Sequence, residues 1–294
     1  MSKEGNIEDV RKGITLVPLG GIACRIRAIT SMIHIAKEYK RPLEILWRTD
    51  DYMPIAVDRL FTLKPNSASE NVVMRQVEWS DRLLSIPPMP CNLYLSFPFV
   101  MLGFDKVLGP GRIEYMMANN RTELDDLFRD LDKSILIATD ESLGKYLGMY
   151  DVLEATVEVN NVLLSSMASW KSKMVGVHIN RRINPRSTHI ESPIELFIRR
   201  MQEMIEADRE VCFFIATTSK DERERLATIF HDRVFVPHSV ADPHTVKGVI
   251  QSFGELLALS HTERILTTPG SNYSKVASDI GGVPLETLSI YTSK

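Results

Sequence analysis

The sequence predicts an α/β protein built on open parallel sheets, and two observations support this fold class. Short apolar runs alternate along the chain with amphipathic segments of helical length, which is the pattern of parallel strands joined by helical crossovers. The chain also has 294 residues, of which 44% are hydrophobic and 25% are charged, and this is enough for two domains that each bury a core.

The first strand–helix–strand unit is predicted close to the N-terminus. Residues Ile14–Leu19 form an apolar run that indicates a strand, and the pair Gly20 and Gly21 indicates a turn. A helix is predicted over Ile22–Tyr39, followed by a second strand over Leu43–Trp47. These segments make one βαβ unit.

The middle third of the chain gives a less regular pattern. Prolines between residues 87 and 98 interrupt an apolar run and predict irregular loops. A helix is expected within 119–133, a strand over 134–139 and a helix over 160–172. We place a domain boundary near Trp170, which gives an N-terminal domain of residues 1–170 and a C-terminal domain of residues 171–294.

The C-terminal half shows the alternation clearly. Strands are predicted over 174–179, 211–216, 234–236 and 264–268, with helices over 193–208, 220–230 and 245–260 and from 274 onward. Two helix starts carry a capping-box spacing, Ser192 with Glu195 and Ser219 with Glu222. Pro193 stands at the first position of the first of these predicted helices, where proline is favoured.

Polar residues cluster where three of these strands end. Because ligands of open parallel sheets bind at the carboxyl ends of the strands, these residues are expected to converge on one cleft. Guanidinium groups and a glycine turn that opens a helix suit a diphosphate. Each feature also has an explanation without a ligand: the arginines can be a solvated surface pair, the glycine segment a plain turn and the histidine a structural residue. The residues are His178, Asn180, Arg181 and Arg182, then Thr217 and Thr218, then Gly270, Ser271 and Asn272.

Charge and composition disfavour several classes of partner. The formal net charge is −3, so nothing in the overall charge favours nucleic acid or anionic lipid. Residues 1–13 do not resemble a signal peptide, and no apolar stretch approaches the roughly 20 residues of a transmembrane segment. Cys24, Cys91 and Cys212 are far apart, which suggests neither a disulfide framework nor a metal site. A cytoplasmic protein without a bound metal is expected.

Four blocks of the sequence resemble conserved blocks of the α-1,6-fucosyltransferases, the nodulation-factor fucosyltransferases and the protein O-fucosyltransferases. The block MVGVHINRR, residues 174–182, resembles their GVHxRR motif, and FFIATTS, residues 213–219, is similar to their second strand and sugar-nucleotide loop. ELLALS, residues 255–260, and TTPGSNYSKVA, residues 267–277, resemble the third block. GGIACRIRA, residues 20–28, with the following RPLEILW, looks like GGLGNRLRA and GRPLxxxW.

The resemblance implies a GT-B-like fold, with two Rossmann-like domains facing a cleft and GDP-fucose held mainly by the C-terminal domain. It implies inverting transfer of fucose to a glycan hydroxyl, with GDP-fucose as donor substrate and no other cofactor. Arg181, with Arg182 in reserve, would stabilise the leaving diphosphate, and His178 would position the donor. Other donor contacts would come from Gly20, Gly21, Asn180, Thr217, Thr218, Glu255, Gly270, Ser271 and Asn272.

Two residues depart from the family pattern. Cys24 stands where the family has Asn, and Asn180 stands where the family has its first arginine. Arg181 is therefore expected to contact the β-phosphate, since an Asn amide carries no charge. The alternatives are a non-catalytic sugar-nucleotide or glycan-binding protein, a GT-B enzyme with another GDP- or UDP-sugar, and an unrelated Rossmann-like enzyme. The last is disfavoured because no G-x-G-x-x-G follows a predicted strand.

Overall fold

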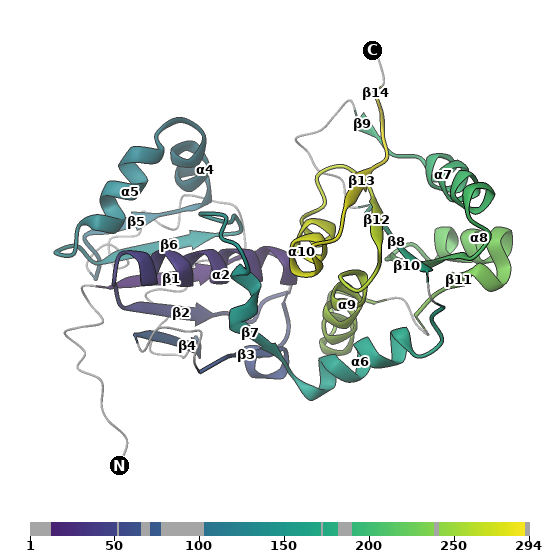
Figure 1. Cartoon of the computed structure of the whole chain (residues 1–294). Helices are drawn as coiled ribbons and strands as arrows, with labels where there is room; N and C mark the ends of the chain where they lie inside the picture. Colours follow the sequence, from purple (N-terminus) through teal and green to yellow (C-terminus); the bar gives the residue numbers. More distant parts are fainter. Residues whose placement is uncertain are drawn as a thin grey trace. The chain divides into compact units, whose positions relative to one another are not determined.

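The computed structural model describes residues 13–51, 53–65, 71–77, 103–171, 173–181, 190–237 and 241–291. The chain divides into two compact units, Met1–Thr156 and Val157–Lys294 (Figure 1). Within the described residues, each unit contains a five-stranded sheet whose strands all pair in parallel. The predicted α/β class with parallel sheets is confirmed. The assignment of the donor to one unit and the acceptor to the other stays a prediction.

The sheet of the first unit has the strand order β4-β2-β1-β6-β5. Its central strand β1 is buried along its whole length, and helix α2 follows it directly, so the predicted βαβ unit is confirmed. The elements are β1 (Ile14–Pro18), α2 (Ile22–Glu38), β2 (Leu43–Trp47), β4 (Val72–Gln76), β5 (Lys106–Leu108) and β6 (Ile135–Thr139).

The helix expected within 119–133 is present, and a second helix that was not predicted precedes it. Helix α4 spans Pro110–Asn119 and helix α5 spans Arg121–Arg129. Helix α5 confirms the predicted helix, and Asn120 separates it from α4 because it leaves the helical conformation, with φ −149° and ψ 57°, and caps α5 by accepting a hydrogen bond from the backbone nitrogen of Glu123. Short elements complete this unit: η1 (Val57–Arg59), β3 (Phe61–Leu63), η4 (Met149–Val152) and β7 (Leu153–Ala155), which pairs with β3. The prolines between residues 87 and 98 lie outside the described residues.

A buried arginine ties the end of α5 to the strands of the first unit. Arg41 is 1% exposed. Its guanidinium donates to the carbonyl oxygens of Leu127 at 2.9 Å and Asp130 at 3.0 Å, and also to those of Gly13 and Lys133. One side chain thus satisfies carbonyl groups from two separate segments of the chain.

The sheet of the second unit has the order β11-β10-β8-β12-β13. A short antiparallel pair, β9 (Ile190–Glu191) with β14 (Ile290–Tyr291), stands beside it. Strands β13 and β14 were not predicted, because they are short runs after the last helix. The sheet strands are β8 (Lys173–Ile179), β10 (Val211–Thr217), β11 (Val234–Phe235), β12 (Arg264–Thr267) and β13 (Leu285–Thr287).

The helices of the second unit are close to the predicted ones. Helix α6 starts and ends earlier than the predicted 160–172 and packs against α9. Helix α10 begins two residues earlier than predicted, because Ser271 caps it. The helices are α6 (Val157–Met167), α7 (Ile194–Ala207), α8 (Lys220–Phe230), α9 (Val246–Leu259) and α10 (Asn272–Gly281), with η5 (His231–Arg233) after α8.

One of the two predicted capping boxes is absent. Ser219 caps α8 as expected, since its side chain accepts a hydrogen bond from the backbone nitrogen of Glu222. At α7 the prediction is wrong, because Pro193 occupies the N-cap position and the helix begins one residue later. Ser192 Oγ instead donates to the carbonyl oxygen of Leu288 at 2.6 Å, which anchors the start of α7 to the segment after β13.

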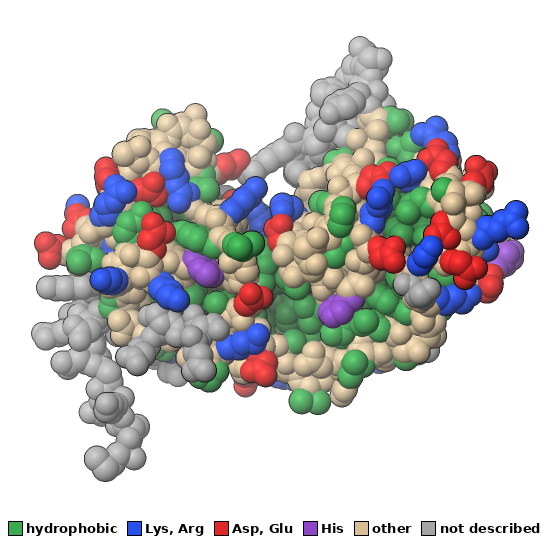
Figure 2. All heavy atoms as spheres, in the orientation of Figure 1, with side chains coloured by type: hydrophobic (Ala, Val, Ile, Leu, Met, Phe, Trp, Pro, Cys, Tyr) green, Lys and Arg blue, Asp and Glu red, His purple; other side chains and the backbone are tan. Residues whose placement is uncertain are grey.

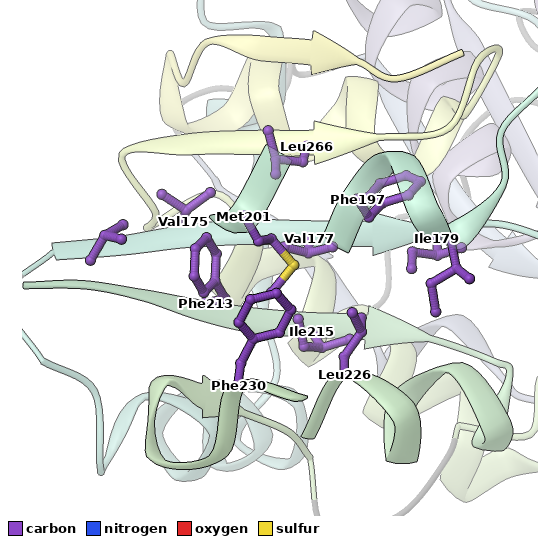
Figure 3. Close-up of a cluster of buried hydrophobic side chains, with 12 residues drawn as sticks. Val175, Val177, Ile179, Phe197, Met201, Phe213, Ile215, Leu226, Phe230 and Leu266 are labelled. Carbon is purple, nitrogen blue, oxygen red and sulfur yellow. The ribbon is translucent and has the colours of Figure 1, made fainter. Parts of the chain in front are cut away.

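The core of the second unit fixes which side chains face the strand ends. Val175, Val177 and Ile179 of β8 point toward α7 and α8, where they meet side chains such as Phe197 and Leu226 (Figure 3). The intervening residues point to the other face, because successive side chains of a strand alternate. There a Cβ on Gly176 would lie 2.7 Å from Leu259 of α9, so glycine allows the helix to approach. His178 lies on this same face.

The surface of the second unit mixes both signs of charge. Figure 2 shows Lys and Arg side chains interspersed with Asp and Glu over the part of this unit drawn at the right. Arg225 of α8, for example, pairs with Glu195 of α7 at 2.9 Å, and Arg200 pairs with Glu286 at 2.6 Å. Among the described residues, no helix is both long and apolar enough to cross a membrane.

Candidate functional site

The second sheet reverses the direction of strand addition at β8. The chain adds β10 and β11 on one side of β8 and then returns to add β12 and β13 on the other side. Open parallel sheets bind ligands at such a switch point, outside the carboxyl ends of the strands. His178 lies there, paired with Ala216 of β10 and with Thr267 of β12. The three predicted polar groups therefore meet at one edge of this sheet.

His178 is held by contacts on several sides. The residue is 9% exposed, and its Nδ1 lies 2.7 Å from Ser274 Oγ and 3.1 Å from Ser271 Oγ. Its ring stacks on Tyr273 with 4.6 Å between the ring centroids. Burial lowers the pKa of His178 to about 3. The imidazole is therefore neutral near pH 7 and can act as a hydrogen-bonding group, but not as a cation.

The turn between β12 and α10 places three predicted donor contacts at a helix N-terminus. Gly270 has a φ of 69°, in the left-handed region that favours glycine. Ser271 is the N-cap, and its Oγ accepts a hydrogen bond from the backbone nitrogen of Ser274 at 3.3 Å. Asn272 is the first residue of the helix. The backbone N–H groups of such a turn suit an anion.

The residues that follow β8 and β10 differ in their surroundings. The backbone nitrogen of Asn180 donates to Thr268 Oγ1 at 3.3 Å, which links the ends of β8 and β12. Thr217 is buried and donates to the carbonyl oxygen of Ile179 at 3.0 Å. Thr218 is exposed. The hydroxyl of Thr217 thus links the ends of β10 and β8. Thr218 is the more accessible of the two threonines.

Arg181 forms an ion pair with a glutamate in the first turn of α8. Its Nε lies 2.7 Å from Oε1 of Glu222, and its Nη2 bonds the same oxygen. Its Nη1 donates to the carbonyl oxygen of Ser192 at 2.6 Å. The side chains of Arg181 and Glu222 are 35% and 16% exposed. An anion at this site has to share the guanidinium with Glu222. Arg182 lies outside the described residues.

Glu255 is a buried carboxyl group on the neighbouring helix α9. It is 5% exposed, and Gln251 Nε2 donates to its Oε1 at 2.7 Å. Burial raises the pKa of Glu255 to about 7. The hydroxyl of Tyr273 donates to the carbonyl oxygen of Ser252 on the same helix. Through this contact and its stacking on His178, Tyr273 connects α9 to the strand end.

The raised pKa of Glu255 predicts a pH-dependent stability. The folded protein disfavours the ionised carboxylate. The contribution of Glu255 to the free energy of unfolding is therefore fully present below pH about 4.5 and is lost as the pH rises through about 7. Between pH 5 and pH 8 the free energy of unfolding of the wild type should fall by about 2–3 kcal/mol more than that of Glu255→Gln. Urea unfolding of both proteins at the two pH values measures the difference. Equal changes in the two proteins would contradict burial of a titrating carboxyl group.

The glycine turn of the first unit lies at the switch point of that unit's own sheet, after β1. Gly20 has a φ of 77°, and Gly21 is the N-cap of α2. Arg25 is fully buried and donates to the carbonyl oxygen of Gly20 at 2.8 Å and to Asp50 Oδ2 at 2.8 Å. Its guanidinium lies 4.7 Å from the ring centroid of Trp47. The turn is thus rigidly supported. Its part in a donor site shared with the second unit stays a prediction.

Sequence reasoning missed the residues that hold His178 and Arg181 in place. Ser274 lies three residues after Ser271, and this spacing puts both hydroxyls on one side of the first turn of α10. That spacing is the signal that could have identified Ser274. Glu222 was predicted only as part of a capping box. Among the residues that the structure describes, no group of His, Cys, Asp or Glu side chains could hold a metal ion.

Comparison with known proteins shows similarity in structure where none is detected in sequence. No protein-family profile and no curated protein matches the chain. NodZ α-1,6-fucosyltransferase soaked with GDP-fucose matches 96% of this chain and 99% of its own, with 16% identity and a TM-score of 0.63. A further matching structure is NodZ from Bradyrhizobium, with 15% identity and a TM-score of 0.61. The chain has the fold of the fucosyltransferases.

Two further fucosyltransferase structures agree with this assignment of the fold. FUT1 of Arabidopsis thaliana in complex with GDP matches 95% of this chain and 73% of its own, with 12% identity and a TM-score of 0.59. POFUT1 in complex with GDP-fucose matches 95% of this chain and 99% of its own, with 11% identity and a TM-score of 0.55. The predicted GT-B-like fold with two Rossmann-like units is confirmed, and the fucosyltransferase fold spans nearly the whole chain.

Proposed function

We propose that this protein is a fucosyltransferase-like glycosyltransferase that moves fucose from GDP-fucose to a hydroxyl group of a glycan. The observation that carries the proposal is the match in fold to fucosyltransferases over nearly the whole chain, two of which were studied with GDP-fucose. The second support is local. His178 and the turn at Gly270–Asn272 meet at the switch point of the second sheet, where such folds bind ligands.

In this proposal the second unit binds the donor and the first unit faces the acceptor. The backbone N–H groups at Ser271 and Asn272 bind phosphate or ribose oxygens, and Arg181 carries the positive charge beside the leaving diphosphate. The acceptor hydroxyl attacks the anomeric carbon as GDP leaves, with inversion at that carbon. Hydrogen-bond donors that already point to where negative charge develops on the leaving diphosphate increase the rate by a factor of about 10²–10³. The proton of the acceptor hydroxyl passes to a general base, a role that we assign to no residue.

Donor binding gives the first test of the proposal. GDP and GDP-fucose are expected to raise the melting temperature, and NAD is expected to leave it unchanged, because a ligand that binds only the folded state stabilises it. We further propose that binding needs no divalent cation and that the enzyme works in the cytoplasm. EDTA in the buffer is then expected to leave the GDP shift intact. A melting temperature raised by NAD but by neither GDP nor GDP-fucose would contradict the proposal.

A second candidate is a non-catalytic protein that binds a sugar nucleotide. It is favoured by the pairing of Arg181 with Glu222 and by the neutral amide of Asn180, which leave little net positive charge among the described residues at the end of β8. The two functions differ in turnover. Release of fucose from GDP-fucose, measured as GDP formed over time with and without glycan acceptors, supports the enzyme. Binding of GDP-fucose without any turnover supports the second candidate.

A further inference from the structure

The hydroxyl groups around His178 form a chain of short contacts. Ser274 Oγ lies 2.7 Å from Nδ1 of the imidazole and 2.6 Å from Thr267 Oγ1. Thr267 Oγ1 lies 3.2 Å from the carbonyl oxygen of Thr268, which can only accept a hydrogen bond. Ser274 and Thr267 are 0% and 2% exposed. Their protons are therefore shared within this chain and not with bulk water.

Two directions of donation are possible along the chain, and they differ in the number of hydrogen bonds. If Nδ1 carries a proton, it donates to Ser274, Ser274 donates to Thr267, and Thr267 donates to the Thr268 carbonyl, which makes three bonds. If Nδ1 is bare, the 2.7 Å contact needs the proton of Ser274, so Thr267 donates to Ser274, Ser274 donates to Nδ1, the carbonyl loses this donor and two bonds remain. Donation to Nδ1 by Ser271 at 3.1 Å instead leaves the 2.7 Å contact between Ser274 Oγ and Nδ1 without a proton, so that two lone pairs face each other. An unmade hydrogen bond in a buried site costs about 1–3 kcal/mol. The first direction is favoured.

We propose that Ser274 and Thr267 are positioning residues that hold His178 in the tautomer with the proton on Nδ1. This inference rests on the proposed function where it concerns the ligand. Its consequence is that Nε2 carries a lone pair and accepts a hydrogen bond from an N–H or O–H group of the bound nucleotide. No described residue hydrogen-bonds Nε2.

The same assignment gives a role to Ser271. Its Oγ lies 3.1 Å from Nδ1 and already accepts from the backbone nitrogen of Ser274. With a proton on Nδ1, the Ser271 hydroxyl cannot donate to that nitrogen. Its own proton is then available for an oxygen of the nucleotide. The site therefore presents one acceptor, Nε2 of His178, and one donor, the Ser271 hydroxyl, at the same strand end.

The tautomer can be observed directly in the free protein. Long-range ¹H–¹⁵N NMR of the ¹⁵N-labelled full chain distinguishes a protonated from a bare ring nitrogen, and the spectrum of His178→Gln assigns the signals. The wild type is expected to show the proton on Nδ1. Thr267→Val keeps the side-chain shape but removes the hydroxyl, so Ser274 loses its acceptor at 2.6 Å. Its other contacts are Nδ1 at 2.7 Å and Ser271 Oγ at the longer distance of 3.2 Å, so Ser274 turns its proton to Nδ1 and the imidazole proton moves to Nε2. Thr267→Ser, the matched control, is expected to keep the wild-type tautomer.

GDP binding then connects the tautomer to the ligand. Calorimetry is expected to show a loss of affinity of about five- to tenfold for Thr267→Val and little change for Thr267→Ser, as for one hydrogen bond. A wild-type spectrum with the proton on Nε2, or no change of tautomer in Thr267→Val, overturns the inference. A change of tautomer without a loss of GDP affinity overturns the role of Nε2 in binding. If the wild type has the expected tautomer but does not bind GDP, the tautomer stands and the proposed function fails.

Discussion

Replacing Arg41 by methionine is expected to lower the free energy of unfolding by about 3–5 kcal/mol, measured by urea unfolding followed by circular dichroism. The guanidinium is 1% exposed and donates to carbonyl oxygens near the end of α5 and at the start of β1. Methionine fills much of the same volume but donates nothing. Several carbonyl oxygens then lose this donor at once; those of Gly13 and Asp130 keep a backbone donor, whereas those of Leu127 and Lys133 lose the guanidinium that bonds them. Each buried carbonyl left without a partner costs about 1–3 kcal/mol.

A surface arginine of the same unit provides the control for this change. Arg129 is 61% exposed and pairs with Asp126 within α5. Arg129→Met is expected to change the free energy of unfolding by no more than about 0.5 kcal/mol, because exposed ion pairs contribute little. If Arg41→Met and Arg129→Met have the same small effect, the carbonyl contacts of Arg41 do not stabilise the first unit.

The strands that carry the candidate site could be predicted because each is a continuous apolar run. Residues 211–216 are buried in β10 almost as predicted, since a strand covered on both faces has to be apolar throughout. The order of the strands within the sheet could not be predicted from the sequence. Nothing in the residues 264–268 shows that β12 pairs with β8 and not with β11, although this pairing brings Thr267 beside His178. Long-range pairing depends on the whole sheet.

The polar contacts were harder to predict than the strands. Ser192 has the spacing of a capping box, yet its hydroxyl bonds Leu288, a residue 96 positions away. The spacing of neighbouring residues cannot reveal that a distant carbonyl group competes for the serine hydroxyl. The same limit applies to Arg181. Its place after β8 indicated an anion site, but the carboxylate that holds it comes from α8, 41 residues later. Buried side-chain networks are set by the packed structure and only partly by local sequence.

Replacing Arg181 by alanine is expected to weaken GDP binding by about 1.5–3 kcal/mol, roughly 10- to 150-fold, the range for a charged hydrogen bond. Turnover of GDP-fucose is expected to fall by about 10²–10³, because the charge beside the leaving diphosphate is lost. Calorimetry with GDP and a GDP-release assay measure the two effects. Arg225→Ala is the matched control. Arg225 lies in α8, the helix of Glu222, and pairs with Glu195, but it is 48% exposed and lies outside the candidate site.

The ion pair with Glu222 gives a second reason why Arg181→Ala could lose affinity, and a double variant separates the two. Without Arg181, Glu222 keeps a carboxylate that is 16% exposed and repels a diphosphate. Adding Glu222→Gln removes that charge. If the guanidinium itself binds the diphosphate, Arg181→Ala/Glu222→Gln stays as weak as Arg181→Ala. If the double variant recovers wild-type affinity, the loss came from the uncovered carboxylate, Arg181 only neutralises Glu222, and the diphosphate is bound by the turn at Gly270–Asn272 alone.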